Sequence, residues 1–241
     1  MKITQAIVRS VPKSFAARAV RMDGMLQISQ PRAEEMHSKY CKVLESILGR
    51  GNVLSLPKLD EDADSCFVED TVVVLPGRHA VFIQPGHESR RTREPETMRD
   101  FLTHAGFAIH HPLTSGATLD GGDVLFTGHS FVVGLSRRTN YEGYLEFRQA
   151  VNHFCPTLQV ESIQVPTTKE GLHLKSVCTM FGPKAICLAA PAASYKFVTE
   201  LREKSRVGDI FQVPDACAAN VLTVNHHVVI RGDEFPESKQ C

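Results

Sequence analysis

Several features that would place a protein in a special class are missing from this sequence of 241 residues. Its 27 basic and 27 acidic side chains balance, and no polybasic run is present. A nucleic-acid or membrane partner is therefore not expected. No apolar stretch approaches the ~20 residues of a transmembrane helix, and residues 1–5 lack the apolar core of a signal peptide. The length suits one large domain or two small ones.

Paired cysteines and linkers are missing too. The seven cysteines are an odd number, are scattered, and form no CxxC or CxxxC motif. This argues against a disulfide framework or a zinc site and predicts a reducing, cytoplasmic setting. No low-complexity or linker stretch divides the chain, so residues 1–241 are expected to form a single domain.

The most informative segment runs from Asp64 to Asp70. It places three carboxylates and a phenyl ring directly before the apolar run 72–75. Read as an extended segment, it points Asp64 and Asp70 to one face and Phe67 and Glu69 to the other, unless the backbone kinks. Carboxylates beside a buried strand are costly unless a cation meets them, and the planar fork of a guanidinium suits paired carboxylates. A helix cap or a surface cluster is the alternative, but the adjoining core strand favours a binding site.

One local pattern, two apolar runs joined by a short turn of Gly, Pro or Asn, occurs four times and predicts β-hairpins. Helical patterns lie between the hairpins, and each is followed by a short apolar strand. The copies lie about fifty residues apart, which is typical of propellers and similar repeat folds. We therefore expect a unit of strand, strand, helix and strand, present four times. The predicted hairpins span residues 70–83, 123–134, 176–188 and 219–230, the helices 32–48, 93–104, 142–154 and 194–204, and the strands after them 53–56, 107–109, 158–160 and 210–213.

The two ends of the sequence bear on how such a ring closes. Residues 3–8 resemble the second strand of a hairpin whose first strand is absent. A ring of repeats could take that strand from the C-terminal end, but residues 236–241 have the pattern of a new helix. We therefore expect the last repeat to be incomplete in this chain, as in a form truncated at its C-terminus.

Polar groups also stand at the mouths of the later hairpins. Asp120-Gly121-Gly122-Asp123 opens the second, where a turn or a calcium-loop fragment is the plain alternative. His173 opens the third, and its position in the repeat favours an acid/base role over a buried core histidine. Arg90 and Arg138 follow the second strands of two hairpins; they are either solvated surface groups or a grip for a carboxylate. Acids for a cation together with arginines for an anion suit an amino acid that bears a guanidinium.

These motifs, taken in order, resemble those of dimethylarginine dimethylaminohydrolase, a guanidine-modifying enzyme family of the pentein fold. The resemblance implies an α/β propeller of five pseudo-symmetric ββαβ repeats with the site on its axis. It runs from Ile7 to Ser238 and rests on FVED (67–70), PGxxSRR (85–91), TLDGGDVLFTG (118–128), GLSRRTN (134–140), GLHLKS (171–176) and AAN (218–220).

The resemblance also implies roles for individual residues. The acids of the first hairpin mouth would bind the substrate's guanidinium, with Phe67 lining the pocket, and the two arginines would bind its carboxylate. His173 would be the general acid/base, and Asp120 would hold its imidazole in the working tautomer. Val20 matches a family position, usually leucine, on a loop over the site. The substrate-binding residues are therefore expected to be Val20, Asp64, Phe67, Glu69, Asp70, Arg90 and Arg138, and the catalytic ones His173 and Asp120.

The family reaction is hydrolysis of asymmetric dimethylarginine or monomethylarginine to citrulline and dimethylamine or methylamine, which relieves inhibition of nitric oxide synthase. It proceeds through a covalent adduct of a cysteine and needs no metal or organic cofactor. The expected partner is therefore a small-molecule substrate, and the protein would be a monomer or a homodimer. The family's cysteine follows a short DG-containing segment near the C-terminus. None of the cysteines here has that context, Cys241 included, so the nucleophile is not identified.

Other readings remain open. Arginine deiminases and amidinotransferases share the fold, but they usually carry an acid two residues after the histidine, where this chain has Lys175. A non-catalytic pentein that binds methylarginines or a protein partner is the second alternative, and the unmatched cysteine favours it. A structural protein without a ligand is the plainest alternative, and the clustered acids and arginines speak against it.

Overall fold

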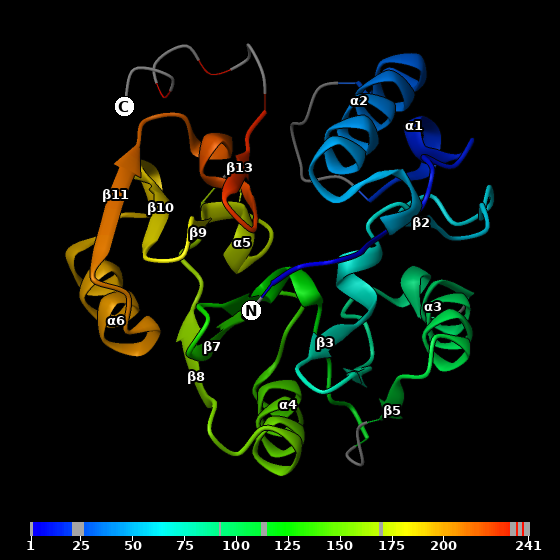
Figure 1. Cartoon of the computed structure of the whole chain (residues 1–241). Helices are drawn as coiled ribbons and strands as arrows, with labels where there is room; N and C mark the ends of the chain where they lie inside the picture. The colour runs from blue at the N-terminus through cyan, green and yellow to red at the C-terminus, as the bar shows by residue number, and fades with distance from the viewer. Residues whose placement is uncertain are drawn as a thin grey trace.

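The computed structural model describes residues 2–20, 27–91, 93–111, 115–168, 171–231, 235 and 238. Five small sheets are arranged around a ring, and the long helices α2, α3, α4 and α6 lie on its outer side (Figure 1). Every sheet is made of strands that follow one another in the chain, so each sheet is one local repeat. This is the propeller-like α/β arrangement that the sequence predicted.

Three repeats are complete and follow the predicted order. In each, the first two strands are antiparallel, and a helix carries the chain to a third strand that runs parallel to the second. They consist of β3 (Val73–Leu75), β4 (His79–Val81), α3 (Arg93–His104) and β5 (Ala108–His110); β6 (Val124–Phe126), β7 (Ser130–Leu135), α4 (Tyr141–Phe154) and β8 (Gln159–Gln164); and β9 (Cys178–Phe181), β10 (Ala185–Ala189), α6 (Tyr195–Ser205) and β11 (Asp209–Val213).

The remaining sheets have two strands each among the described residues. At the N-terminal end, β1 (Ala6–Val8) is parallel to β2 (Val53–Ser55), and α2 (Gln30–Leu48) connects them after the short α1 (Phe15–Arg18). At the other end, β12 (Leu222–Val224) and β13 (His227–Val229) form an antiparallel hairpin. The expectation of four full units is thus corrected to three full units and two partial ones. The helix expected at 236–241 lies almost wholly outside the described residues, and so does Cys241.

The helix boundaries follow from ordinary start and stop signals. In α4 the Asn140 side chain accepts a hydrogen bond from the Gly143 amide at 2.8 Å, and in α6 Ser194 does the same for the Phe197 amide. Such caps satisfy amides that have no partner in the first turn of a helix. At the other end of α2, Gly49 has a φ of 90°, which a residue with a side chain rarely adopts.

The core is divided in the same way as the sheets. Each of the four hydrophobic clusters joins one sheet to the helix that covers it and to strands of the next repeat. In α3, for example, Met98 and Leu102 lie one turn apart and pack against Ala80 and Phe82 of the neighbouring strand segment. No helix of the described residues is long and apolar enough to span a membrane. The repeats therefore form a rigid frame around a polar axis.

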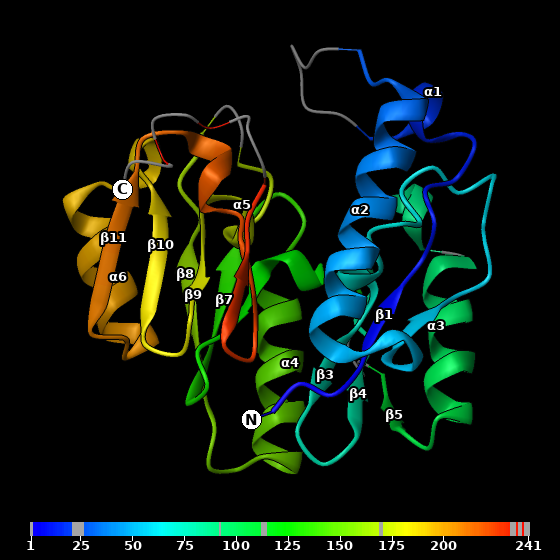
Figure 2. The same ribbon diagram turned by 45° about the horizontal axis from the view of Figure 1, so that its top comes forward.

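Residues far apart in the sequence meet where the ring approaches closure. The Asn225 side chain, in the turn between β12 and β13, accepts a hydrogen bond from the Ile3 amide at 2.8 Å and donates one to the Ile3 carbonyl at 2.9 Å. The turn from Val224 to His227 thus holds the N-terminal strand segment by both backbone groups of one residue. The N-terminal segment and the red β12–β13 hairpin can be followed in Figure 2.

Candidate functional site

The acidic segment 64–70 does not form the extended run expected from its alternation. The Phe67 amide donates to the Asp64 carbonyl at 3.0 Å, and the chain continues as the 3₁₀ helix η2 (Val68–Thr71). These turns replace the two-sided pattern of a strand. Arg90 stabilises these turns, because its Nη2 donates hydrogen bonds to the carbonyls of Asp64 and Phe67. The kink that the sequence left open is therefore present, and it is held by a buried guanidinium.

A buried ion network lies beneath this turn. Nη1 of Arg90 donates to Oδ2 of Asp70 at 2.6 Å, and its Nε and Nη2 donate to Oε2 of Glu94 at 3.1 and 2.8 Å. All three side chains are nearly inaccessible to solvent. Burial alone would raise the pKa of Asp70, but Arg90, His173 and Lys175 outweigh it, and the pKa lies below its ordinary value. Asp70 is therefore ionised at neutral pH.

His173 lies at the centre of the site, among three buried carboxylates. Its Nδ1 lies 3.2 Å from Oδ2 of Asp123, and its Nε2 lies 3.7 Å from Oδ2 of Asp120. Burial lowers the pKa of His173, but the hydrogen bond to Asp123 and the charges of Asp70, Asp123 and Asp120 raise it above its ordinary value overall. The geometry thus favours an imidazolium that can deliver a proton, as a general acid must.

The structure gives the role of imidazole holder to a residue that the sequence interpretation did not single out. Asp123 is fully buried, and it accepts hydrogen bonds from Ser136 and Thr139, both at 2.7 Å, besides its contact with His173. Its other oxygen accepts from the Leu174 amide at 2.8 Å. The sequence signal was present, because Asp123 is the last residue of the DGGD motif.

Asp120, the acid expected to orient the imidazole, lies on the Nε2 side of the His173 imidazole, opposite Asp123. Its Oδ1 accepts from the Gly86 amide at 2.8 Å, and its backbone amide donates to Oγ1 of Thr139. Burial and the neighbouring charge of Asp70 raise the pKa of Asp120. A carboxyl group in this position is suited to receive or share a proton with Nε2 of His173.

The two glycines between these acids permit the close approach. A Cβ at Gly122 would lie 2.8 Å from both Oδ1 of Asp70 and the imidazole of His173, and one at Gly121 would collide with the Glu69 carbonyl oxygen. The Gly122 amide also donates to Oδ1 of Asp70 at 3.0 Å. The motif is therefore a contact between two repeats, and a side chain at either glycine would push them apart.

Asp64 and Phe67 belong to the same segment, but Asp64 is buried and Phe67 is exposed. The Asp64 carboxylate accepts from the Val20 amide at 3.1 and 3.2 Å. Burial raises the pKa of Asp64. Phe67 is 46% exposed, and its ring lies 5.8 Å from that of Phe15. An exposed ring beside a carboxylate can cover the alkyl part of a cationic ligand.

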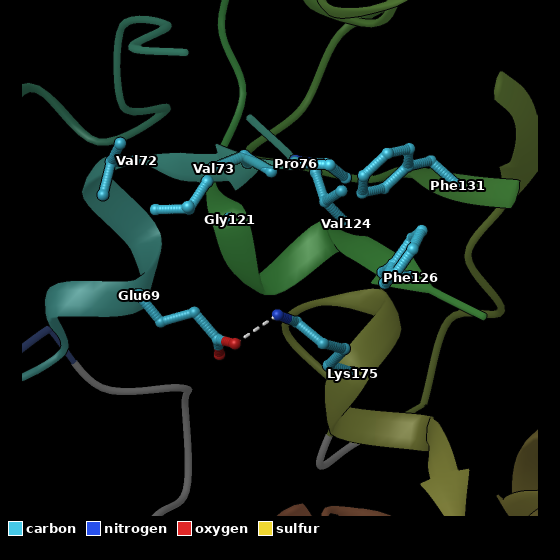
Figure 3. A pocket seen from close by; sticks show the side chains of 10 residues that line it. Glu69, Val72, Val73, Pro76, Gly121, Val124, Phe126, Phe131 and Lys175 are labelled. Carbon is cyan, nitrogen blue, oxygen red and sulfur yellow. Dashed lines mark hydrogen bonds and ion pairs between the residues drawn. The ribbon is translucent and has the colours of Figure 1, made fainter. Parts of the chain in front are cut away.

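Glu69 forms an ion pair with Lys175, which comes from the short helix α5 (Leu174–Val177) (Figure 3). The pair lies at the edge of an otherwise apolar cavity of about 190 Å³. The apolar lining comes from β3, β6 and β7 and from residues next to β3, with Val72, Val73, Val74, Pro76, Val124, Phe126 and Phe131.

Arg138 is the second arginine of the expected carboxylate grip. Its guanidinium donates no hydrogen bond to the residues that the structure describes, although its charge reaches Asp64 and His87. Its backbone is fixed, because its amide donates to Oγ of Ser136 and Gly86 packs directly against its carbonyl. The Arg90 guanidinium, in contrast, donates its hydrogen bonds to Asp70, Glu94 and two backbone carbonyls. Of the two arginines, Arg138 has the donors available to a ligand.

Burial acts against ionisation of the thiol in four of the six described cysteines. Burial raises the pKa of the thiols of Cys66 and Cys178 to about 12, and it also raises the pKa of Cys41 and Cys155. A thiolate is the attacking species in cysteine chemistry, so these four are poorly suited to it. Cys241 lies outside the described residues, and the nucleophile is not identified.

A cation is a further occupant to consider at the centre of the site. One ligand atom from each of Asp70, Asp120 and His173 lies within 4.8 Å of the others. Oδ2 of Asp70 is already paired with Arg90, and its Oδ1 accepts from Gly122. A metal ion would have to compete with these contacts, so the donor set fits a protein-bound proton better than a metal.

Comparison with known sequences places the chain in a family. The sequence model of the arginine deiminase family matches residues 58–230. A dimethylarginine dimethylaminohydrolase from Pseudomonas aeruginosa is 34% identical over 216 residues, which cover 87% of this chain and 76% of that protein. DDAH2 from Homo sapiens is 30% identical over 197 residues, and the match spans 82% of this chain but only 66% of that protein.

Comparison with solved structures supports the fold. A dimethylarginine dimethylaminohydrolase from Pseudomonas aeruginosa, solved as a cysteine-to-serine variant with citrulline, superposes with a TM-score of 0.83 at 23% identity and covers 100% of this chain and 88% of its own. A histidine-to-glycine variant of a dimethylarginine dimethylaminohydrolase, solved as an adduct with S-methyl-L-thiocitrulline, gives a TM-score of 0.82. The solved structures show the same fold, and the sequence matches show that the chain belongs to the dimethylarginine dimethylaminohydrolase family of penteins.

Proposed function

We propose that this protein binds Nω-methylated arginines at the mouth formed by η2, η4 (Gly121–Asp123) and α5, and that the site is built for their hydrolysis to citrulline and an alkylamine. The single observation that carries the proposal is the buried His173, held by Asp123 and facing Asp120 and Asp70. A proton donor surrounded by carboxylates is what the departure of an amine from a guanidinium requires. The family membership supports the same substrate class.

The substrate's positive charge would be met by the acids of the segment 64–70. Asp64 and Glu69 offer carboxylates at the mouth, and the buried, ionised Asp70 adds negative charge behind them. The exposed ring of Phe67 would cover the alkyl chain. Arg138 donates no side-chain hydrogen bond within the described part of the chain, so its guanidinium would bind the α-carboxylate, and Arg90 would bind it too. Its observed contacts give Arg90 the further role of holding Asp70 in place.

The proposed reaction has two steps. A cysteine thiolate attacks the central guanidinium carbon, and His173 gives its proton to the departing methylamine or dimethylamine. Water, deprotonated by His173, then attacks the thiouronium carbon, and citrulline leaves as the thiolate is regenerated. Fixing the carbon between carboxylates and the proton donor would supply much of the rate through orientation.

Citrulline release tests the proposal. The purified chain is incubated with asymmetric dimethylarginine and, in parallel, with arginine, and citrulline is measured over time. Release from the methylated substrate alone is expected if a resident cysteine attacks, and cysteine-to-serine variants would then identify it. Release from arginine at a similar rate would instead favour an arginine deiminase.

A second candidate is binding without turnover, and the raised pKa of the thiols of Cys41, Cys66, Cys155 and Cys178 favours it. Isothermal titration of asymmetric dimethylarginine into the chain separates the two. Heat of binding without citrulline production would indicate a methylarginine-binding protein. The absence of both binding and turnover in a chain that unfolds cooperatively would overturn the proposed function.

A further inference from the structure

In the proposed function the Glu69 carboxylate binds the substrate's guanidinium, but here it is already paired with the ammonium of Lys175. The Lys175 side chain is only 18% exposed, whereas that of Glu69 is 64% exposed. Figure 3 shows the ammonium reaching across from α5 to the carboxylate of Glu69 on η2. Lys175 thus carries a largely desolvated charge that depends on a carboxylate open to solvent.

The other acids of the site are less available to an incoming cation. Asp70 is paired with Arg90 and accepts from the Gly122 amide, and both partners are buried. Asp64 accepts from the Val20 amide through both oxygens and is itself largely buried. Glu69 is the exposed acid of the three, and its ionic partner is a lysine on a flexible stem. A guanidinium that approaches from solvent would therefore meet Glu69 already neutralised.

We propose that Lys175 sets the preference of this site between cationic and neutral side chains by competing with the substrate's guanidinium for Glu69. The inference rests on the proposed function, because it presupposes that a methylarginine binds here. When the cation arrives, Glu69 exchanges the ammonium for the guanidinium. When the guanidinium has become an uncharged ureido group, it no longer competes, and the ammonium of Lys175 returns to Glu69.

The competition has a physical cause in each direction. A close ion pair with a half-desolvated partner is stronger than an exposed one, so its disruption weakens binding of the cationic ligand. A neutral ureido group offers no charge to replace Lys175, so it binds with the ion pair intact. Lys175 thus lowers affinity for the substrate and assists release of the product. Such a group acts on the balance between two bound states without touching the reacting carbon.

Titration calorimetry of the full chain with asymmetric dimethylarginine and with citrulline tests this. Lys175→Met is expected to lower the Kd for dimethylarginine on the order of tenfold, because it removes a partly buried charge that competes for Glu69. The Kd for citrulline should change less than threefold. Lys175→Arg keeps the charge and should behave as the unaltered chain. Lys39→Met removes one charge from an exposed pair on α2 with Glu35 and controls for net charge.

A double-mutant cycle makes the attribution to Glu69 specific. In a Glu69→Gln background, Lys175→Met should no longer improve dimethylarginine binding, because the contested carboxylate is gone. If the unaltered chain binds dimethylarginine and Lys175→Met does not tighten it, the competition is wrong and the proposed function stands. If Lys175→Met unfolds, Lys175→Gln takes its place in the same cycle. If no folded variant binds dimethylarginine, both proposals fail together.

Discussion

The candidate site contains two sets of charged groups that the fold holds very differently. The inner set consists of Asp70, Arg90, Glu94, Asp120, Asp123 and His173, all buried and bonded to one another or to backbone amides. The outer set consists of Glu69, Arg138 and Lys175, together with the exposed ring of Phe67. The inner set is fixed by folding, while the outer set keeps donors, acceptors or an exchangeable partner.

This difference indicates a division of labour. Groups that orient a proton donor must not move when a ligand arrives, and a buried network in which every charged group is hydrogen-bonded satisfies that condition. Groups that recognise a ligand must exchange one partner for another, which a solvated carboxylate or an unpaired guanidinium does at low cost. Under the proposed function, carboxylates would therefore serve structure in the inner set and ligand recognition in the outer set.

The largest expected effect comes from removing the guanidinium of the inner set. Arg90→Ala leaves Asp70 and Glu94 buried without their cation, and breaking a buried pair in this way costs about 3–5 kcal/mol. Arg138→Ala removes an outer guanidinium with no hydrogen bond to the described residues, so its stability should stay within about 0.5 kcal/mol. Urea denaturation of both variants measures the contrast. Equal destabilisation would show that the two arginines belong to the same set.

A smaller loss of stability is expected where Gly122 packs against Asp70 and His173. Gly122→Ala places a methyl group 2.8 Å from Asp70 and from the imidazole of His173, and overpacking of this kind costs about 1–3 kcal/mol. Gly208→Ala is the matched control, because a Cβ there meets no atom within 4 Å. The control should be neutral or slightly stabilising, since it restricts the unfolded chain. Thermal unfolding of both variants measures the difference in stability. If Gly122→Ala is as stable as the unaltered chain, the repeats can separate at this contact.

Much of the fold was predictable because it repeats. Every hairpin and every long helix in the described part of the chain lies where the apolar patterns predicted it, and the helix Arg93–His104 matches in both bounds. The segment 64–70 was not predictable as a turn, because its alternation is that of a strand. Its conformation is set by Arg90, which lies 20 residues beyond Asp70 and binds the carbonyls of Asp64 and Phe67.

The site was predictable in its membership more than in its contacts. Motif order pointed to the acids, the arginines and His173, but the sequence alone does not say which carboxylate contacts which nitrogen. Asp123 was missed as the imidazole's partner because DGGD offers two acids, and only the packing of η4 against α5 separates them. The pairing of Glu69 with Lys175 was likewise hidden, since 106 residues separate the two.

A choice between those two acids sharpens the comparison within the inner set. Asp123→Asn removes the hydrogen-bonded carboxylate and is expected to lower the pKa of His173 more than Asp120→Asn does, because the Asp120 oxygen lies 3.7 Å away. It should also cost about 1–3 kcal/mol, since an amide cannot accept from all of the donors Ser136, Thr139 and the Leu174 amide. Titration of the histidine ring by NMR gives the pKa of each variant. A larger fall in Asp120→Asn would return the role to Asp120.

The smallest expected effect is that of pH on the free energy of unfolding, which acts on the inner set through His173. Because folding raises the pKa of His173, the stability it contributes is complete below the unfolded value of about 6.5 and is lost as pH rises through the folded value. Asp70 behaves in the opposite way: its lowered pKa contributes stability above the unfolded value of 3.8, and that stability is lost as pH falls through the folded value. The raised pKa values of Asp64, Glu94 and Asp120 oppose Asp70 on the acid side. The free energy of unfolding, measured by urea from pH 6 to 9 for the chain and for His173→Gln, isolates the histidine. The chain should lose stability relative to the variant as pH rises, and parallel curves would mean that the carboxylates around His173 do not hold its proton.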